Sequence, residues 1–231
     1  MSRPAASVAP FKAVVFDAYG TLFDVHSVAS LAEQLFPGKG EALSQLWRQK
    51  QLEYSWLRAM SRRYKPFWEI TRDALRFSAM RLGLPLTTEL EGRLMNQYSS
   101  LSAFPENLQA LRDMKAAGLA LGILTNGNQD MIEVSVRSSG MTGLFDHLLS
   151  SQTVETFKTM DSIYALAPEA FGCGAHEILF VSSNCWDAIG ARWYGYTSFW
   201  INRGGMPLEQ LDTEPHHTGR LLTDVLSVAR A

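Results

Sequence analysis

Short apolar runs alternate along most of the chain with longer segments of helical periodicity. The apolar runs predict strands at about 13–16, 119–124, 147–150, 178–182 and 197–201. Helical spacing of apolar residues predicts helices between them, at about 130–139, 162–171 and 187–194. This alternation is typical of a parallel sheet with helices on both faces, so we expect an α/β fold.

A helical block interrupts the alternation between residues 25 and 102. It has no strand-like segment, and apolar residues such as Leu43 and Trp47 recur at spacings of three and four. Pro37-Gly38 and Pro85 interrupt the block, and a new helix is predicted near Thr88. We expect this block to be a second, purely helical subdomain.

Composition narrows the class of protein without identifying it. The 231 residues are 46% hydrophobic and carry a formal net charge of −2, with no basic run that would indicate nucleic acid or a membrane surface. Residues 1–10 are expected to form a loose tail. The two cysteines, Cys173 and Cys185, lack metal-ligand spacing, which favours a reducing compartment, by default the cytoplasm.

Polar residues follow three of the predicted strands. Asp17, Thr125 and Ser182 stand where these strands end, and ligands bind at the carboxyl ends of parallel strands. Asp17 precedes a Gly-Thr turn, and such an acid can serve as a nucleophile, a metal ligand or merely a turn residue. Thr125-Asn126-Gly127 offers a hydroxyl, a carboxamide and free amides at a helix start, which attracts anions but is also ordinary turn chemistry.

Two further polar groups are ambiguous when taken alone. Lys158 precedes a predicted helix that contains Tyr164, and a lone lysine is more often a solvated surface residue. The segment Ser182-Ser183-Asn184-Cys185-Trp186-Asp187 holds more polar groups than a loop needs, although Asn184 and Asp187 could simply cap the next helix.

Taken together, these segments resemble one known family. The motifs are Phe16-Asp17-Ala18-Tyr19-Gly20-Thr21-Leu22, Trp47-Arg48-Gln49-Lys50-Gln51-Leu52-Glu53-Tyr54, Leu124-Thr125-Asn126-Gly127, Phe157-Lys158 and Ser182–Asp187. They occur in the same order in the L-2-haloacid dehalogenases of the haloacid dehalogenase superfamily, and the similarity runs from about residue 11 to 205. The resemblance implies a Rossmann-like core (10–24 and 104–231), a helical cap (25–103) and a homodimer.

The resemblance also implies a reaction and a set of site residues. Asp17 would displace halide from C2 of a short L-2-haloalkanoic acid, and water would release a D-2-hydroxy acid from the aspartyl ester, without metal or cofactor. Asp187, positioned by Asn184, would orient that water. The implied catalytic residues are Asp17, Lys158, Asp187, Asn184 and Arg48. The implied binding residues are Thr125, Asn126, Trp186, Tyr19 and Phe67, with Thr21, Ser182 and Tyr164 in support.

This chain departs from the family pattern at two positions, and rival functions are also open. The family commonly has serine at the position of Thr125 and proline at that of Thr159. A phosphatase or phosphonatase of the superfamily would share Asp17, but phosphatases usually carry an acid where this chain has Tyr19. A magnesium site would also call for an acid where Ser183 stands. A non-catalytic domain that binds a small anion is the other alternative, and the preferred halogen, fluoride included, stays open.

Overall fold

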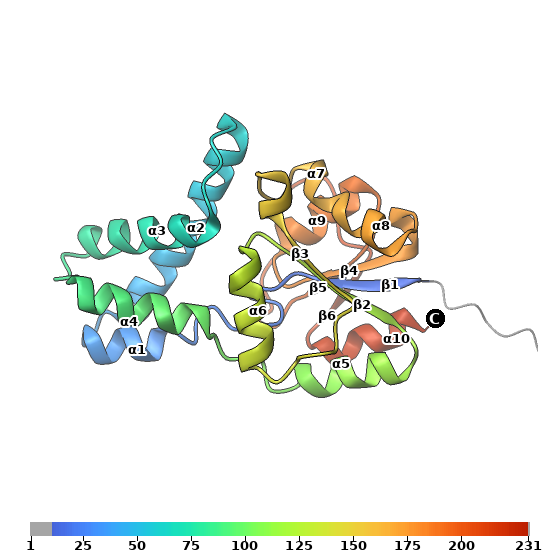
Figure 1. The fold of residues 1–231 in the computed structure, drawn as a ribbon, viewed down its shortest axis with the longest axis horizontal. Helices are drawn as coiled ribbons and strands as arrows, with labels where there is room; N and C mark the ends of the chain where they lie inside the picture. The colour runs from blue at the N-terminus through green and yellow to red at the C-terminus, as the bar shows by residue number, and fades with distance from the viewer. Residues whose placement is uncertain (1–10, 231) are drawn as a thin grey trace, which may run out of the picture.

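The computed structural model describes residues 11–230, so the predicted tail at 1–10 lies outside the described part. One parallel sheet runs through it in the order β3-β2-β1-β4-β5-β6, which confirms the α/β fold class (Figure 1). Its strands are β1 (Ala13–Phe16), β2 (Ala120–Thr125), β3 (His147–Ser150), β4 (Ile178–Ser182), β5 (Thr197–Ile201) and β6 (His217–Gly219).

Helices cover both faces of the sheet. They are α5 (Asn107–Ala116), α6 (Gln129–Ser138), α7 (Asp161–Tyr164), α8 (Leu166–Phe171), α9 (Cys185–Tyr194) and α10 (Val225–Ala229), with 3₁₀ turns η1 (Ser151–Val154), η2 (Ala175–Glu177) and η3 (Leu222–Asp224). Successive side chains of β1 point to opposite faces. Val14 and Phe16 belong to the apolar cluster that contains Leu111 of α5, whereas Val15 joins the cluster with Ala167 of α8. The strand is therefore buried on both faces.

The strand order brings the ends of β1 and β4 together. The chain passes from β1 to β2 and β3 on one side, and β4 to β6 lie on the other side, so the order reverses between β1 and β4. Phe16 is in register with Val181, and both strands end at the same edge. Such a switch point is where open α/β sheets bind ligands.

The remaining helices form a separate block beside the sheet (Figure 1). They are α1 (Ala29–Leu35), α2 (Gly40–Ser61), α3 (Phe67–Arg81) and α4 (Thr88–Ser99). The Thr87 hydroxyl accepts a hydrogen bond from the backbone N–H of Leu90 and so caps α4. All four lie within residues 25–103, which we keep as the proposed bounds of the cap. In the described range, no helix is both long and apolar enough to cross a bilayer.

Two sequence predictions were wrong in detail. The single helix expected at 162–171 is divided into α7 and α8. Pro168 has no N–H to donate to the carbonyl of Tyr164 four residues earlier, and the hydroxyl of Tyr196 donates to that carbonyl instead. The prediction also missed β6, because three residues at the sheet edge with partly exposed side chains give no apolar pattern.

Candidate active site

Asp17 directly follows β1 and is 6% exposed. Its backbone N–H donates to Val181 at 2.9 Å and extends the β1–β4 pairing by one residue. The carboxylate accepts hydrogen bonds from the Thr21 hydroxyl and the Asn184 side-chain amide, both at 2.9 Å, and from the Lys158 ammonium, also at 2.9 Å. Three donors therefore orient the carboxylate.

The turn after Asp17 requires a glycine. Gly20 has a φ of +97°, and a Cβ there would lie 3.2 Å from the Ser183 hydroxyl. This left-handed conformation is strained for any residue with a side chain. The turn holds Thr21 so that its hydroxyl donates to Asp17 and accepts from the backbone N–H of Ser183 at 2.8 Å. Thr21 thus connects the ends of β1 and β4.

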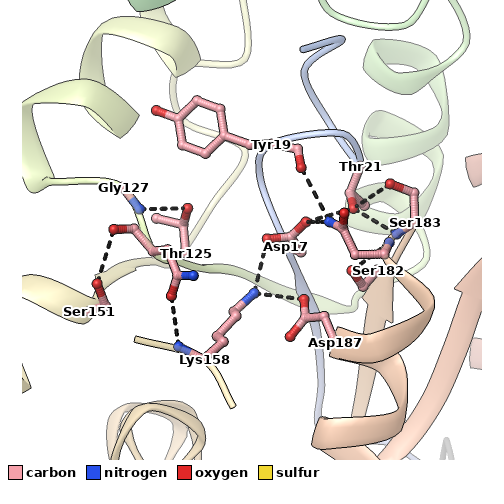
Figure 2. A network of polar contacts seen from close by, with 12 residues as sticks. Asp17, Tyr19, Thr21, Thr125, Gly127, Ser151, Lys158, Ser182, Ser183 and Asp187 are labelled. Carbon is pink, nitrogen blue, oxygen red and sulfur yellow. Dashed lines mark hydrogen bonds and ion pairs between the residues drawn. The ribbon is translucent and has the colours of Figure 1, made fainter. Parts of the chain in front are cut away.

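Lys158 lies between two carboxylates (Figure 2). Its ammonium is 2.9 Å from Asp17 and 2.8 Å from Asp187, and the side chains of Lys158 and Asp187 are almost fully buried. The Tyr164 hydroxyl donates to the other oxygen of Asp187 at 2.7 Å. Since an unpaired buried charge is costly, the three charged groups stabilise one another.

Burial and charge shift the pKa values of this cluster. Burial acts to lower the pKa of Lys158, but the carboxylates of Asp17 and Asp187 together raise it above its usual value. Burial raises the pKa of Asp187, and the attraction of Lys158 offsets only part of that shift. Burial also raises the pKa of Tyr164, well above its usual value. Lys158 is therefore a cation at neutral pH, and Tyr164 stays a hydrogen-bond donor.

The side chain of Asn184 is directed to Asp17 rather than to the carboxylate of Asp187, which differs from the expectation that Asn184 positions Asp187; the two residues are joined by a backbone hydrogen bond of 3.0 Å, from the N–H of Asp187 to the carbonyl of Asn184. Its side-chain amide donates to Asp17 at 2.9 Å and to the carbonyl of Tyr19 at 3.3 Å. The carboxylate of Asp187 is held by Lys158 and Tyr164 instead. Asn184 is the N-cap of α9, and its side chain is turned toward the β1 loop, whereas Asp187 lies in the first turn of the helix.

The end of β2 supplies Thr125 and Asn126. The buried Thr125 hydroxyl accepts from the backbone N–H of Gly127 at 3.1 Å, which fixes the turn (Figure 2). The Asn126 side-chain carbonyl accepts from the backbone N–H of Lys158 at 2.9 Å, which leaves its amide nitrogen as a donor for a ligand. Ser182, at the end of β4, similarly accepts from the backbone N–H of Asn184 at 3.1 Å.

Arg48 approaches this edge from helix α2. Its guanidinium donates to the carbonyl of Tyr19 at 3.2 Å, the same oxygen that accepts from Asn184. Arg48, Asn184 and Trp186 line one side of a cavity of about 790 Å³ that extends between the helical block and the core. A cation from the block and a donor from the core therefore meet at the carbonyl of Tyr19, two residues after Asp17.

Several aromatic side chains pack against one another near the loop that follows Asp17. The Tyr19 ring is buried and packs against Phe67 and Tyr98, with ring centroids 6.2 and 6.0 Å apart. Burial raises the pKa of Tyr19, so its phenol is not an acid at neutral pH. Trp186 packs edge-on against Trp56 of α2, with centroids 5.4 Å apart.

Two residues that hold the nucleophile loop were not predicted from the sequence. The Asn107 side-chain amide donates to the carbonyls of Thr21 and Leu22 at 3.1 and 3.0 Å. Arg203 donates to the carbonyls of Gly20 and Thr21 at 3.3 and 3.2 Å. Arg203 follows β5 at the carboxyl edge of the sheet, and this position was the only signal available in the sequence.

The carboxylates of the site do not form a metal-binding set. No group of three His, Cys, Asp or Glu side chains suited to a metal ion occurs in residues 11–230. Asp17 and Asp187 are bridged by the Lys158 ammonium, and the residue two positions after Asp17 is a buried phenol. Both cysteines, Cys173 and Cys185, are free.

Comparisons with known proteins point to one enzyme family. A family model for haloacid dehalogenase-like hydrolases matches residues 11–195. An (S)-2-haloacid dehalogenase from Pseudomonas putida is 46% identical over 212 residues, which is 92% of this chain and 93% of that protein.

Solved structures of the same kind of enzyme are similar to this chain over nearly its whole length. One L-2-haloacid dehalogenase superposes with a TM-score of 0.94 at 56% identity, over 96% of this chain and 99% of the other. An L-2-haloacid dehalogenase from Xanthobacter autotrophicus, solved with chloropropionic acid covalently bound, has a TM-score of 0.90 at 37% identity and the same coverage of both chains.

Proposed function

The chain belongs to the haloacid dehalogenase-like hydrolases, and within them to the (S)-2-haloacid dehalogenases, and from this premise we propose how its residues divide the reaction. The protein is a hydrolase that acts on carbon–halide bonds. We propose that it converts short L-2-haloalkanoic acids to D-2-hydroxy acids through an ester on Asp17, with inversion at C2 and without a metal. The observation that carries this proposal is the buried Lys158 ammonium held between Asp17 and Asp187.

In the first step, an oxygen of Asp17 attacks C2 from the side opposite the halogen. A C–O bond forms, the C–halogen bond breaks, and the halide leaves with the electron pair. No proton is consumed, so the reaction does not need an acid at the position of Tyr19. Lys158, Thr21 and Asn184 keep the carboxylate oriented. Arg48 and the Asn126 amide receive the leaving halide, since a guanidinium stays charged when it is desolvated.

In the second step, water hydrolyses the ester. Asp187 orients the water, whose oxygen bonds to the ester carbonyl carbon of Asp17 while the bond between that carbon and the ester oxygen breaks. One proton of the water passes to the departing oxygen and the other is released to solvent, so Asp17 is regenerated as a carboxylate. The 2-hydroxy acid leaves with the oxygen bound to C2, which preserves the inverted configuration of the first step. The Lys158 ammonium lies against both carboxylates and stabilises the negative charge that develops on the ester.

The substrate is proposed to bind by its carboxylate and its apolar side. The Thr125 hydroxyl and the amides of the turn after β2 lie at a helix start, which favours an anion. Tyr19, Phe67 and Trp186 provide apolar surface for the alkyl group. Thr125 keeps the hydroxyl of the serine found in the family, and we therefore expect an altered substrate range rather than loss of activity.

Assembly and location are part of the same proposal. We propose a homodimer in the cytoplasm. Trp56, Leu57 and Met60 near the end of α2 are exposed apolar side chains, of the kind that subunit contacts cover. The two free cysteines fit a reducing compartment. Light scattering of the purified protein measures the oligomeric state.

A substrate panel tests the proposed function. The purified protein is incubated with L- and D-2-chloropropionate, chloroacetate and fluoroacetate, with and without a chelator, and free halide is measured. We expect chloride from the L-isomer and from chloroacetate, a D-2-lactate product, and no effect of the chelator. A parallel assay with phosphate esters tests the alternative function. Magnesium-dependent release of phosphate, without release of halide from the haloacids, would show that the protein is a phosphatase instead.

A further inference from the structure

Helix α2 carries an unusual polar residue on its buried face. Residues 43, 47, 51, 55 and 59 recur every four positions and are all buried, so they form the face that packs inside the helical block. Gln51 lies in the middle of this face and is 0% exposed. A buried carboxamide costs free energy unless each of its polar atoms is hydrogen-bonded.

Every polar atom of the Gln51 carboxamide is engaged. Its nitrogen donates to the Thr71 hydroxyl at 2.6 Å. Its oxygen accepts from the Arg48 guanidinium at 2.7 Å and from the Tyr98 hydroxyl at 3.0 Å. The network joins α2, α3 and α4, since Thr71 lies in α3 and Tyr98 in α4.

The network also determines which way the carboxamide faces. The Thr71 hydroxyl donates its only proton to the carbonyl of Phe67 at 2.8 Å, so toward Gln51 it can only accept. The NH₂ group of Gln51 must therefore face Thr71. Its oxygen must then face Arg48 and Tyr98, which are both donors. Burial raises the pKa of Tyr98, which keeps its hydroxyl protonated.

We propose that Gln51, held by Thr71 and Tyr98, is a positioning residue that fixes the Arg48 guanidinium beside the nucleophile loop. This inference rests on the function proposed above, in which Arg48 receives the leaving halide. Arg48 makes two hydrogen bonds to protein among the described residues. The bond to Gln51 at 2.7 Å is shorter than the bond to the Tyr19 carbonyl at 3.2 Å. One nitrogen of the guanidinium is thus fixed from inside the block.

A neutral partner suits this task better than a carboxylate. A glutamate at position 51 would neutralise Arg48 and weaken its attraction for a halide. The neutral amide oxygen orients the guanidinium and leaves its net charge available. Because Gln51 lies on the buried face of α2, it acts on the reaction only through Arg48.

A double-mutant cycle tests this role. The rate of halide release in a single turnover is measured for wild type, Gln51→Leu, Arg48→Ala and the double variant, with L-2-chloropropionate and L-2-bromopropionate. We expect Gln51→Leu to slow release by about 10- to 100-fold, the range for a hydrogen bond to a charged group. In the Arg48→Ala background it should change the rate by no more than about twofold.

The choice of halogen separates positioning from a general structural defect. Loss of halide stabilisation slows the poorer leaving group more, so both Gln51→Leu and Arg48→Ala should widen the ratio of bromide to chloride release. A fraction of misfolded enzyme would lower both rates equally. Ser78→Ala is the matched control, because Ser78 is equally buried in α3 and its hydroxyl, among the residues that the structure describes, donates only to the carbonyl of Ala74.

Each outcome decides the matter. The positioning role would be overturned if Gln51→Leu slowed halide release equally in the wild-type and Arg48→Ala backgrounds, or if the ratio of bromide to chloride release did not change. In either case, halide release by wild type would still support the proposed function. No halide release by wild type would overturn both. If Gln51→Leu does not fold, Thr71→Val enters the same cycle, because it removes the hydroxyl that orients the Gln51 amide.

Discussion

The two regions that meet at the site hold their cations in different ways. At the sheet edge, Lys158 is buried and paired with two carboxylates, Asp17 and Asp187. In the helical block, Arg48 is half-buried and is held by the neutral oxygens of Gln51 and Tyr19. The charge of Lys158 is balanced by its two carboxylate partners, whereas Arg48 has no hydrogen-bonded acid among residues 11–230.

This difference matches the tasks proposed for the two cations. Lys158 must hold the Asp17 carboxylate in place until it attacks C2, and a buried ion pair does that. Arg48 must attract a halide that appears only as the bond breaks, so its charge must be free at that moment. Removal of Lys158 should therefore lower both stability and activity, whereas removal of Arg48 should lower the rate with little effect on stability.

Asp17→Asn tests the nucleophile at the sheet edge and should have the largest effect. An amide cannot form the ester, so halide release should fall below detection, while cooperative thermal unfolding persists. Asn184→Ala is a useful comparison, because it removes one donor to Asp17 and leaves the nucleophile. Multiple turnovers by Asp17→Asn would place the nucleophile elsewhere.

Lys158→Met tests the paired cation through stability. The substitution leaves two buried carboxylates without their cation, a change that costs about 3–5 kcal/mol. We expect the free energy of unfolding in urea to fall by this amount, together with a loss of activity. Lys115→Met is the control, because the Lys115–Asp146 pair is partly exposed and such pairs contribute only about 0–1 kcal/mol. Equal effects of the two variants would contradict the description of the buried cluster.

Arg48→Ala sharpens the contrast, because here rate and stability should separate. We expect kcat to fall by about 10²–10³, the cost of removing one donor to a developing charge, with little change in Tm. Arg58→Ala serves as the control, since Arg58 lies on the same helix and donates only to the carbonyl of Arg63 among the described contacts. Near-normal halide release by Arg48→Ala would show that Arg48 is a surface residue of the cap with no role in the reaction.

The pH dependence gives a smaller effect that concerns the sheet edge alone. Asp187 must be ionised to orient water, and burial raises its pKa above the usual 3.8, so ester hydrolysis should slow as the pH falls through that raised value. In the free enzyme Lys158 has a pKa above its usual 10.5, so the alkaline decline of kcat/KM, which reports the free enzyme, should begin only beyond that. Single-turnover hydrolysis for the acid limb and kcat/KM for the alkaline limb, each measured between about pH 3 and 12 as a range around the usual values, test both expectations. An acid limb at or below pH 3.8 would be inconsistent with this account.

The polar residues at the sheet edge could largely be predicted from the sequence, because they lie where strands end. Asp17, Thr125 and Ser182 each end or follow an apolar run, and parallel strands bring such residues to one edge. The side-chain direction of Asn184 could not be predicted in this way. A residue that caps a helix can turn toward the helix or toward a neighbouring loop, and here the β1 loop supplies the acceptors.

The helical block was predictable only as a block. Its helices follow from apolar spacing, but the network around Arg48 depends on packing between helices. The side chains of Thr71 and Tyr98 lie 20 and 47 positions from Gln51 in the sequence. A pattern read along one helix contains no information about such partners. The apolar spacing that includes Leu43 and Trp47 predicted a helix, but it did not predict that the polar Gln51 is buried.

The covalent ester on Asp17 is tested most directly with Asp187→Asn. This substitution should spare the attack by Asp17 and slow hydrolysis of the ester. After mixing with L-2-chloropropionate, the account predicts a burst of about one equivalent of chloride per active site. The peptide containing Asp17 should gain the mass of the acid minus hydrogen chloride. Rapid multiple turnovers with no trapped adduct would contradict the role of Asp187, and a burst with the adduct on another residue would contradict the nucleophile.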